Sequence, residues 1–240
     1  MNPGLQGSRA RAHASFSLNR DSSESLAREF YDEWIGQSGF LSVVGRLVFS
    51  LSGLVYAEAF VRAAALSSHD KVLEVGCGFG TILREAQTRI GAWQVYVGID
   101  ISYQMISRAQ KNTKKTGKGE RIQFAVGNAV DLPFRASQFD VILLSHVIKY
   151  LTDEQFIQVL AEAKRVLRAH GRIVIWEFSP YLSSSVTQCI VRSCNAQKLR
   201  GAAEVRKTLQ RCGYADLEFF EVRTPWLPWR NVAFAGRAIR

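Results

Sequence analysis

The sequence has few cysteines and prolines, and it has no long uninterrupted apolar run. Its four cysteines form no C-x-x-C pair and lack histidine partners at zinc spacing, so we predict neither a disulfide framework nor a metal site. The most apolar stretch, 40–66, is broken by Arg46, Glu58 and Arg62 and lacks the roughly 20 apolar residues that cross a bilayer. A hydrophobic content of 47% excludes a disordered or collagen-like chain. We therefore expect a soluble or peripheral protein from a reducing compartment.

Acidic residues are the minority, because 31 Lys and Arg stand against 21 Asp and Glu, which gives a formal net charge of +10 over 240 residues. A basic surface attracts nucleic acid, anionic lipid and acidic substrates alike, and it also occurs as an ordinary solvated face. The clearest basic run consists of Arg108, Lys111, Lys114, Lys115 and Lys118. The charge leaves contact with nucleic acid and peripheral membrane contact open.

Residues 1–23 are rich in Ser, Ala, Gly and Arg and contain no acid before Asp21. Such a segment cannot bury a core, so we predict a disordered leader. The composition also suits a mitochondrial presequence, although Pro3, Gly4 and Gly7 weaken the amphipathic helix that this signal requires. We expect a cytoplasmic protein, with mitochondrial targeting as the alternative.

Apolar residues recur at helical spacing over 24–68, which predicts an N-terminal helical cap. After the cap, short β-rich runs alternate with amphipathic segments. Thr152 and Gln155 can form a capping box at the start of one of these helices, which we expect to end just before Gly171. The expected strands are 71–75, 94–99, 121–125, 139–144, 172–178, 217–222 and 231–239.

Repeated strand–helix–strand units imply a doubly wound, mostly parallel sheet. We therefore predict an α/β fold with a Rossmann-like, seven-stranded sheet and the N-terminal helical cap. The cap and the α/β core, 69–240, would form a single domain over 24–240.

A glycine-rich turn follows the first expected strand, with Gly76, Gly78 and Gly80 spaced as G-x-G-x-G. A dinucleotide-binding turn has its third glycine one place later, where this chain has Thr81. The carboxylate of Glu74, just ahead of the turn, would repel a phosphate and suits an ammonium or sulfonium group. The turn therefore favours a positively charged ligand, unless its glycines serve only tight packing.

Polar residues also follow the next three expected strands. Asp100 ends the second strand, where a carboxylate can accept two hydrogen bonds from a ribose diol or can cap the following helix. Asn128 follows the third strand, and Ser145 and His146 end the fourth. Because ligands bind at the carboxyl ends of parallel strands, we expect these blocks to converge on one crevice.

Five blocks occur in order over 71–179, namely V-L-E-V-G-C-G-F-G, G-I-D-I-S-x-x-M, G-N-A-x-x-L-P-F, F-D-V-I and L-R-A-H-G-R-I-V-I-W-E-F-S. In this combination the chain resembles the class I S-adenosylmethionine-dependent methyltransferases, and among them the ubiquinone/menaquinone-biosynthesis C-methyltransferases. The resemblance implies methyl transfer with S-adenosyl-L-methionine as cofactor. The cap lacks the motif of the quinone enzymes and the region 180–209 is shorter than theirs, so the acceptor stays open.

The resemblance also assigns cofactor contacts. Asp100 would hold the ribose hydroxyls, and Asn128 would meet the adenine edge in place of the aspartate that the family commonly has. Tyr31 resembles a cap tyrosine that closes over the cofactor. The remaining expected contacts are Glu74, Gly76, Cys77, Gly78, Gly80 and Ser145 at the methionine part, and Ile101, Met105 and Ala129 at the adenine.

A sulfonium methyl is already electrophilic, so the protein must mainly hold a nucleophile in line and exclude water. His146 is the candidate general base, or it only lines the strand end, and Tyr150 and Glu177 are further candidates on the substrate side. The apolar cap and Trp226 and Trp229 favour a small apolar or lipid-like acceptor. The alternatives are an RNA or protein methyltransferase and a non-catalytic S-adenosylmethionine-binding module.

Overall fold

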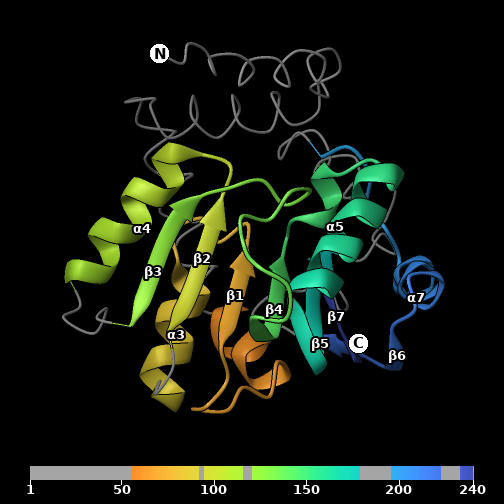
Figure 1. Cartoon of the computed structure of the whole chain (residues 1–240), viewed down its shortest axis with the longest axis horizontal. Coiled ribbons are helices and arrows are strands. Elements are labelled where there is room, and N and C mark those ends of the chain that lie inside the picture. The colour runs from red at the N-terminus through yellow and green to blue at the C-terminus, as the bar shows by residue number, and fades with distance from the viewer. Residues whose placement is uncertain (1–55, 92–94, 116–120, 179–195, 223–232, 240) are drawn as a thin grey trace, which may run out of the picture.

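The computed structural model describes residues 56–91, 95–115, 121–178, 196–222 and 233–239. Within them, one sheet has the strand order β3-β2-β1-β4-β5-β7-β6 (Figure 1). The first five strands in this order, β3, β2, β1, β4 and β5, are parallel to one another, whereas β7 runs antiparallel to both β5 and β6. The predicted, mostly parallel α/β sheet is confirmed. The strands are β1 (Val72–Val75), β2 (Tyr96–Asp100), β3 (Ile122–Val126), β4 (Phe139–Ser145), β5 (Leu167–Phe178), β6 (Ala215–Val222) and β7 (Ala233–Ile239).

Helices pack on both faces of the sheet, because alternate residues of each strand point to opposite sides. Leu73 and Ile142 belong to a core formed with α5 and α7, and Val72 and Val141 to a second core with α3 and the helix over 56–63. Burial on both sides explains why the central strands read as nearly continuous apolar runs. The other helical elements are α3 (Thr81–Ile90), α4 (Tyr103–Lys115), η1 (Ile148–Tyr150), α5 (Asp153–Val166) and α7 (Ala202–Arg211).

The predicted capping box starts helix α5. Thr152 Oγ1 accepts a hydrogen bond from the Gln155 backbone N–H at 3.2 Å, and Gln155 Oε1 accepts one from the Thr152 N–H at 2.9 Å. The helix ends at Val166, earlier than we expected, because the buried Leu167 already pairs with Phe139 as the first residue of β5. His170 therefore lies within a strand, where its φ of 62° accompanies the register shift between β4 and β5.

The strand order reverses at β1, which lies between β2 and β4. Val75 is paired with Ile99 on one side and with Leu144 on the other, so three strand ends meet where open α/β sheets bind their ligands. Of the expected N-terminal cap, 56–63 is helical, whereas 24–55 and the leader lie outside the described residues. None of the helices in the described part of the chain is long and apolar enough to cross a bilayer.

Candidate active site

The turn after β1 is shaped by its glycines, because Gly76, Gly78 and Gly80 have φ values of 73°, 51° and 68°. A Cβ on Gly76 would lie 2.3 Å from Val147 Cγ2, and one on Gly80 would lie 2.6 Å from Phe124 Cζ. A Cβ on Gly78 would meet no atom within 4 Å. Close packing therefore requires glycine at positions 76 and 80, whereas the backbone of Gly78 faces open space.

Asp100 joins the end of β2 to this turn. Its Oδ2 accepts a hydrogen bond from the Gly78 N–H at 2.9 Å, and its Oδ1 accepts one from the Ser102 N–H at 2.9 Å. Ser102 caps helix α4, since its hydroxyl accepts from the Met105 N–H at 3.2 Å. These contacts hold the Asp100 carboxylate, an acceptor of hydrogen bonds, at the mouth of the glycine-rich turn.

Glu74 is a buried carboxyl beneath the same turn, with only 1% of its surface exposed. Its Oε2 has no hydrogen-bond partner among the described residues. Burial, followed by the neighbouring charge of Asp100, raises the pKa of Glu74 well above its usual range, whereas Arg84 and a backbone hydrogen bond from Leu83 oppose the rise. Such a carboxyl fits a cationic ligand, because a positive charge nearby would stabilise its ionised form.

Cys77 lies within the glycine-rich turn and is also buried. Burial, with the charges of Glu74 and Asp100, raises the pKa of its thiol well above the usual range. The neutral thiol can line a ligand site, and it lacks the character of a nucleophile.

The end of β3 approaches Asp100, because the Gly127 N–H donates to the Asp100 carbonyl at 3.0 Å. Asn128 uses its Oδ1 to accept from the Val130 N–H at 3.1 Å. Ile101 and Ala129 are half-buried, whereas the Met105 side chain is packed inside with 2% exposure. The structure thus brings together the polar strand ends that we predicted. Tyr31 lies outside the described residues.

The end of β4 places His146 beside the following strand. Ser145 pairs with Trp176, and the His146 N–H donates to the Trp176 carbonyl at 2.8 Å. His146 has a φ of 57°, in the left-handed region that side chains rarely adopt. Its Nδ1 lies 3.3 Å from Glu177 Oε1, and 27% of its side chain is exposed. Val147, next in the chain, packs against Gly76 and so connects His146 to the glycine-rich turn.

Glu177 and Lys149 form a buried ion pair behind His146. Glu177 is fully buried and its Oε1 lies 3.6 Å from Lys149 Nζ, while its Oε2 accepts from the Lys149 backbone N–H at 3.1 Å. Lys149 Nζ also donates to the His146 carbonyl. Burial lowers the pKa of His146, as does the charge of Lys149, whereas Glu177 opposes the shift. We call His146, Lys149 and Glu177 the buried triad. Sequence reasoning missed Lys149, whose one signal was a charge in an apolar segment.

A second buried cation holds η1, the short helix that carries Lys149. Arg200 is fully buried and donates to the carbonyls of Ile148 and Leu151, and also to Asp153 Oδ1 at 2.7 Å. The backbone N–H groups of residues 197 and 198 donate to the Lys149 carbonyl at 2.8 Å and 3.1 Å. The segment 197–200 therefore fixes the backbone on which the buried triad depends.

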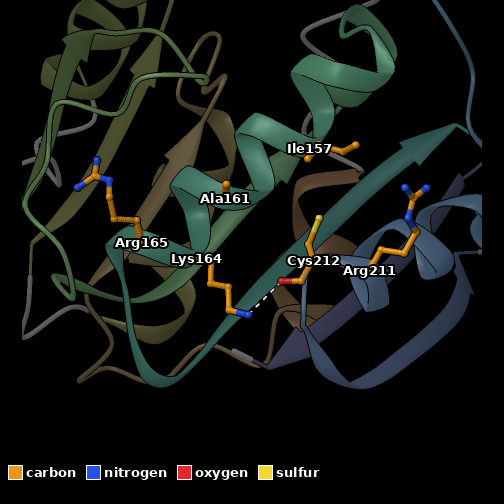
Figure 2. A pocket seen from close by; sticks show the side chains of 6 residues that line it. All are labelled: Ile157, Ala161, Lys164, Arg165, Arg211 and Cys212. Carbon is orange, nitrogen blue, oxygen red and sulfur yellow. Dashed lines mark hydrogen bonds between the residues drawn. The ribbon is translucent and has the colours of Figure 1, made fainter.

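A hollow of about 510 Å³ lies elsewhere, between α5 and α7 (Figure 2). Its basic side chains include Lys164, which donates to the Cys212 carbonyl at 3.0 Å, and Arg165, which donates to the carbonyls of Leu132 and Phe134. The hollow shares no residue with the strand-end site. Within the described residues, no group of three or more His, Cys, Asp or Glu side chains is arranged to hold a metal ion.

Comparison with known families agrees with this geometry. Residues 72–171 match the family model described as a methyltransferase domain. The ubiquinone/menaquinone biosynthesis C-methyltransferase UbiE of Hahella chejuensis is 31% identical over 143 residues, which cover 59% of this chain and 55% of that protein. UbiE of Citrifermentans bemidjiense is 34% identical over 119 residues, which cover 50% of each. The chain thus spans about half the length of these curated relatives.

A solved structure extends the likeness in fold. One chain of the complex between the Haloferax volcanii Trm112 methyltransferase activator and a methyltransferase aligns with a TM-score of 0.73 and 17% identity, covering 89% of this chain and 96% of that one. Residues 72–171 thus form a methyltransferase domain. The predicted class, a class I S-adenosylmethionine-dependent methyltransferase, is confirmed for these residues.

Proposed function

We propose that this protein binds S-adenosyl-L-methionine at the joined ends of β1, β2 and β3 and transfers its methyl group to a small acceptor. When bound, this cofactor supplies an electrophilic methyl on a sulfonium centre and also carries an ammonium group. The observation that carries the proposal is the buried carboxyl of Glu74 beneath the open backbone of Gly78. A carboxylate without a full set of partners suits a cationic ligand, and bare glycine backbone permits close approach.

In this proposal the glycine-rich turn contacts the methionine part of the cofactor, and Asp100 contacts the ribose. Asp100 is held toward the turn by the Gly78 N–H, and its carboxylate is of the chemical type that accepts hydrogen bonds from ribose hydroxyls. Asn128 would meet the adenine edge, and His146 would be the general base. The other proposed contacts are Gly76, Cys77, Gly80, Ile101, Met105, Ala129, Ser145 and Tyr31.

The proposed acceptor is a small apolar or lipid-like molecule. Support comes from the apolar sequence over 40–66, from Trp226 and Trp229, and from relatives whose names refer to C-methylation in ubiquinone and menaquinone biosynthesis. A lipid-like acceptor would favour peripheral membrane contact. We further propose a cytoplasmic protein that acts as one domain over 24–240. The net charge of +10 favours a second candidate, an RNA or protein acceptor.

The cofactor assignment is tested by calorimetry with S-adenosylmethionine and with its demethylated product. Gly78→Ala should weaken binding about tenfold or more, which is 1.4 kcal/mol, because the new Cβ would occupy the open space over the turn. Gly91→Ala is the matched control. Gly91 has a similar φ of 65° and open surroundings, but it lies at the opposite end of α3. Equal losses in the two variants would refute the proposed cofactor position.

The acceptor is tested by radiolabelled methyl transfer to lipid extracts, to phenolic extracts and to RNA. We expect label in a lipid-soluble product. Label in RNA alone would replace the first candidate with the second. Tight cofactor binding with no label in any fraction would favour the non-catalytic module.

A further inference from the structure

The buried triad contains more charge than a packing role requires. A fully buried carboxylate such as Glu177 loses its hydration, which is strongly unfavourable unless partners compensate it. Here the compensation comes from the Lys149 ammonium at 3.6 Å, the Lys149 N–H at 3.1 Å and the His146 ring at 3.3 Å. Glu177 and Lys149 are covered, and His146, with 27% of its side chain exposed, is the member that a ligand can reach.

The position of Glu177 determines where the imidazole of His146 carries its proton. An ionised carboxylate only accepts hydrogen bonds, so a neutral imidazole that faces it must donate from the facing nitrogen. That nitrogen is Nδ1, at 3.3 Å from Glu177 Oε1. The second nitrogen, Nε2, then has a lone pair and can accept a proton.

The backbone and the surrounding groups hold the ring in this orientation. His146 has a φ of 57°, a backbone conformation that is unfavourable for a residue with a side chain and persists only where its surroundings fix it. Its N–H is bonded to Trp176, and its carbonyl accepts from Lys149 Nζ. The ring of Tyr56 lies edge-on at 6.5 Å. Among the groups that face His146 are Glu177 from β5, Lys149 from η1 and Tyr56 from the helix over 56–63.

We propose that Glu177 and Lys149 are positioning residues that keep His146 protonated at Nδ1, so that its Nε2 takes a proton from a hydroxyl-bearing acceptor. This inference rests on the proposed methyl transfer. His146 Nε2 accepts the hydroxyl proton, and the oxygen electron pair forms the bond to the methyl carbon. The electron pair of the broken carbon–sulfur bond stays on sulfur. The imidazolium, stabilised by Glu177, then returns its proton to water.

The replacement Glu177→Gln tests this arrangement because it should reverse the tautomer. The Lys149 N–H donates to one end of the Glu177 carboxylate, so the amide oxygen of the glutamine would take that end. Its NH₂ group would then face His146 Nδ1, which must become the acceptor. Nε2 would carry the proton and could no longer act as a base.

The first readout is the tautomer of His146, measured by ¹H–¹⁵N correlation spectra of the full-length protein with ¹⁵N-labelled histidine. The chain has four histidines, and the signals that disappear in His146→Gln identify those of His146. We expect protonated Nδ1 in the wild type and protonated Nε2 in Glu177→Gln. Protonated Nε2 in the wild type overturns the proposal, and this outcome needs no acceptor.

The second readout is turnover, with the acceptor found by the labelling experiment. Glu177→Gln and His146→Gln should each lower kcat by about 100-fold to 10,000-fold, the usual contribution of a general base, with unchanged cofactor affinity. The double variant should lose no more than either single variant. Glu218→Gln, on the exposed part of β6, is the matched control and should keep wild-type kcat.

The two readouts separate the possible failures. Methyl transfer that is insensitive to His146→Gln would overturn this inference and leave the proposed function standing. Absence of cofactor binding in the wild type would instead refute the proposed function. A parallel loss of turnover and cofactor affinity in Glu177→Gln would assign Glu177 a merely structural role.

Discussion

The two halves of the site are built by different means. On the proposed cofactor side, backbone groups dominate: three glycines with positive φ follow β1, and Asp100 is held by two backbone N–H groups. On the proposed acceptor side, side chains dominate: Glu177 in β5 forms an ion pair with Lys149 in η1 and contacts His146, which follows β4. We therefore expect the proposed cofactor side to be sensitive to added side-chain volume, and the proposed acceptor side to be sensitive to the loss of a charged group.

Gly76→Ala should have the largest effect, because it strains the glycine-rich turn of the proposed cofactor side. A Cβ at a φ of 73° costs about 1–2 kcal/mol, and its overlap with Val147 Cγ2 at 2.3 Å adds about 1–3 kcal/mol. We expect the free energy of unfolding, measured by denaturant titration, to fall by about 2–5 kcal/mol. Gly91→Ala, with a similar φ of 65° and no neighbour within 4 Å, should pay only the backbone part. A loss for Gly76→Ala no greater than that of the control would contradict this account.

Arg200→Met should have a smaller effect and strike the acceptor side. The change leaves the carbonyls of Ile148 and Leu151 without their buried donor, and each unsatisfied group costs about 1–3 kcal/mol. We expect the free energy of unfolding to fall by about 2–4 kcal/mol, the lower part of the range for two such groups, with kcat reduced more than cofactor affinity. Arg206→Met, which removes one bond to the Leu217 carbonyl from a half-buried position, should cost less than about 1 kcal/mol. Equal unfolding midpoints for wild type and Arg200→Met would show that the Arg200 hydrogen bonds contribute nothing to stability.

Glu74→Gln should have the smallest effect and sharpen the comparison, since it removes the ionisable carboxyl group that is buried on the proposed cofactor side. Because the pKa of Glu74 is raised in the folded protein, the folded state binds a proton that the unfolded state has lost. The stability of the ligand-free wild type should therefore fall as pH rises from about 4.3, the ordinary pKa of glutamate, to the raised folded value. Glu74→Gln should lack this fall and bind the cofactor more weakly. Parallel stability curves for the two proteins across this range would contradict the prediction.

The glycine-rich turn and the polar strand ends could be predicted from the sequence because their signals are local. Gly76, Gly78 and Gly80 lie in one turn, and strand ends such as Asp100 must meet at one edge of a parallel sheet. The sequence pattern left open which groups bind Asp100. In the structure Ser102 caps α4, and Asp100 accepts a hydrogen bond from the Gly78 N–H in the turn after β1.

The acceptor side could not be predicted in the same way, because it depends on contacts between distant residues. Lys149 and Glu177 are 28 positions apart and meet only once β4 and β5 pair. The early end of α5 has a similar cause, since burial of Leu167 and its pairing with Phe139 outweigh a helical spacing that continues toward Gly171. An ion pair between residues so far apart produces no repeating pattern in the sequence.

The segment 197–200, bonded back to η1, gives the acceptor side a property that the cofactor side lacks. The chain departs from β5 one residue after Glu177 and returns, at residue 197, to the carbonyl of Lys149. Two distant positions of the chain, Glu177 and residue 197, are therefore held at the same buried lysine. A change at Lys149 would thus act on two distant parts of the chain at once.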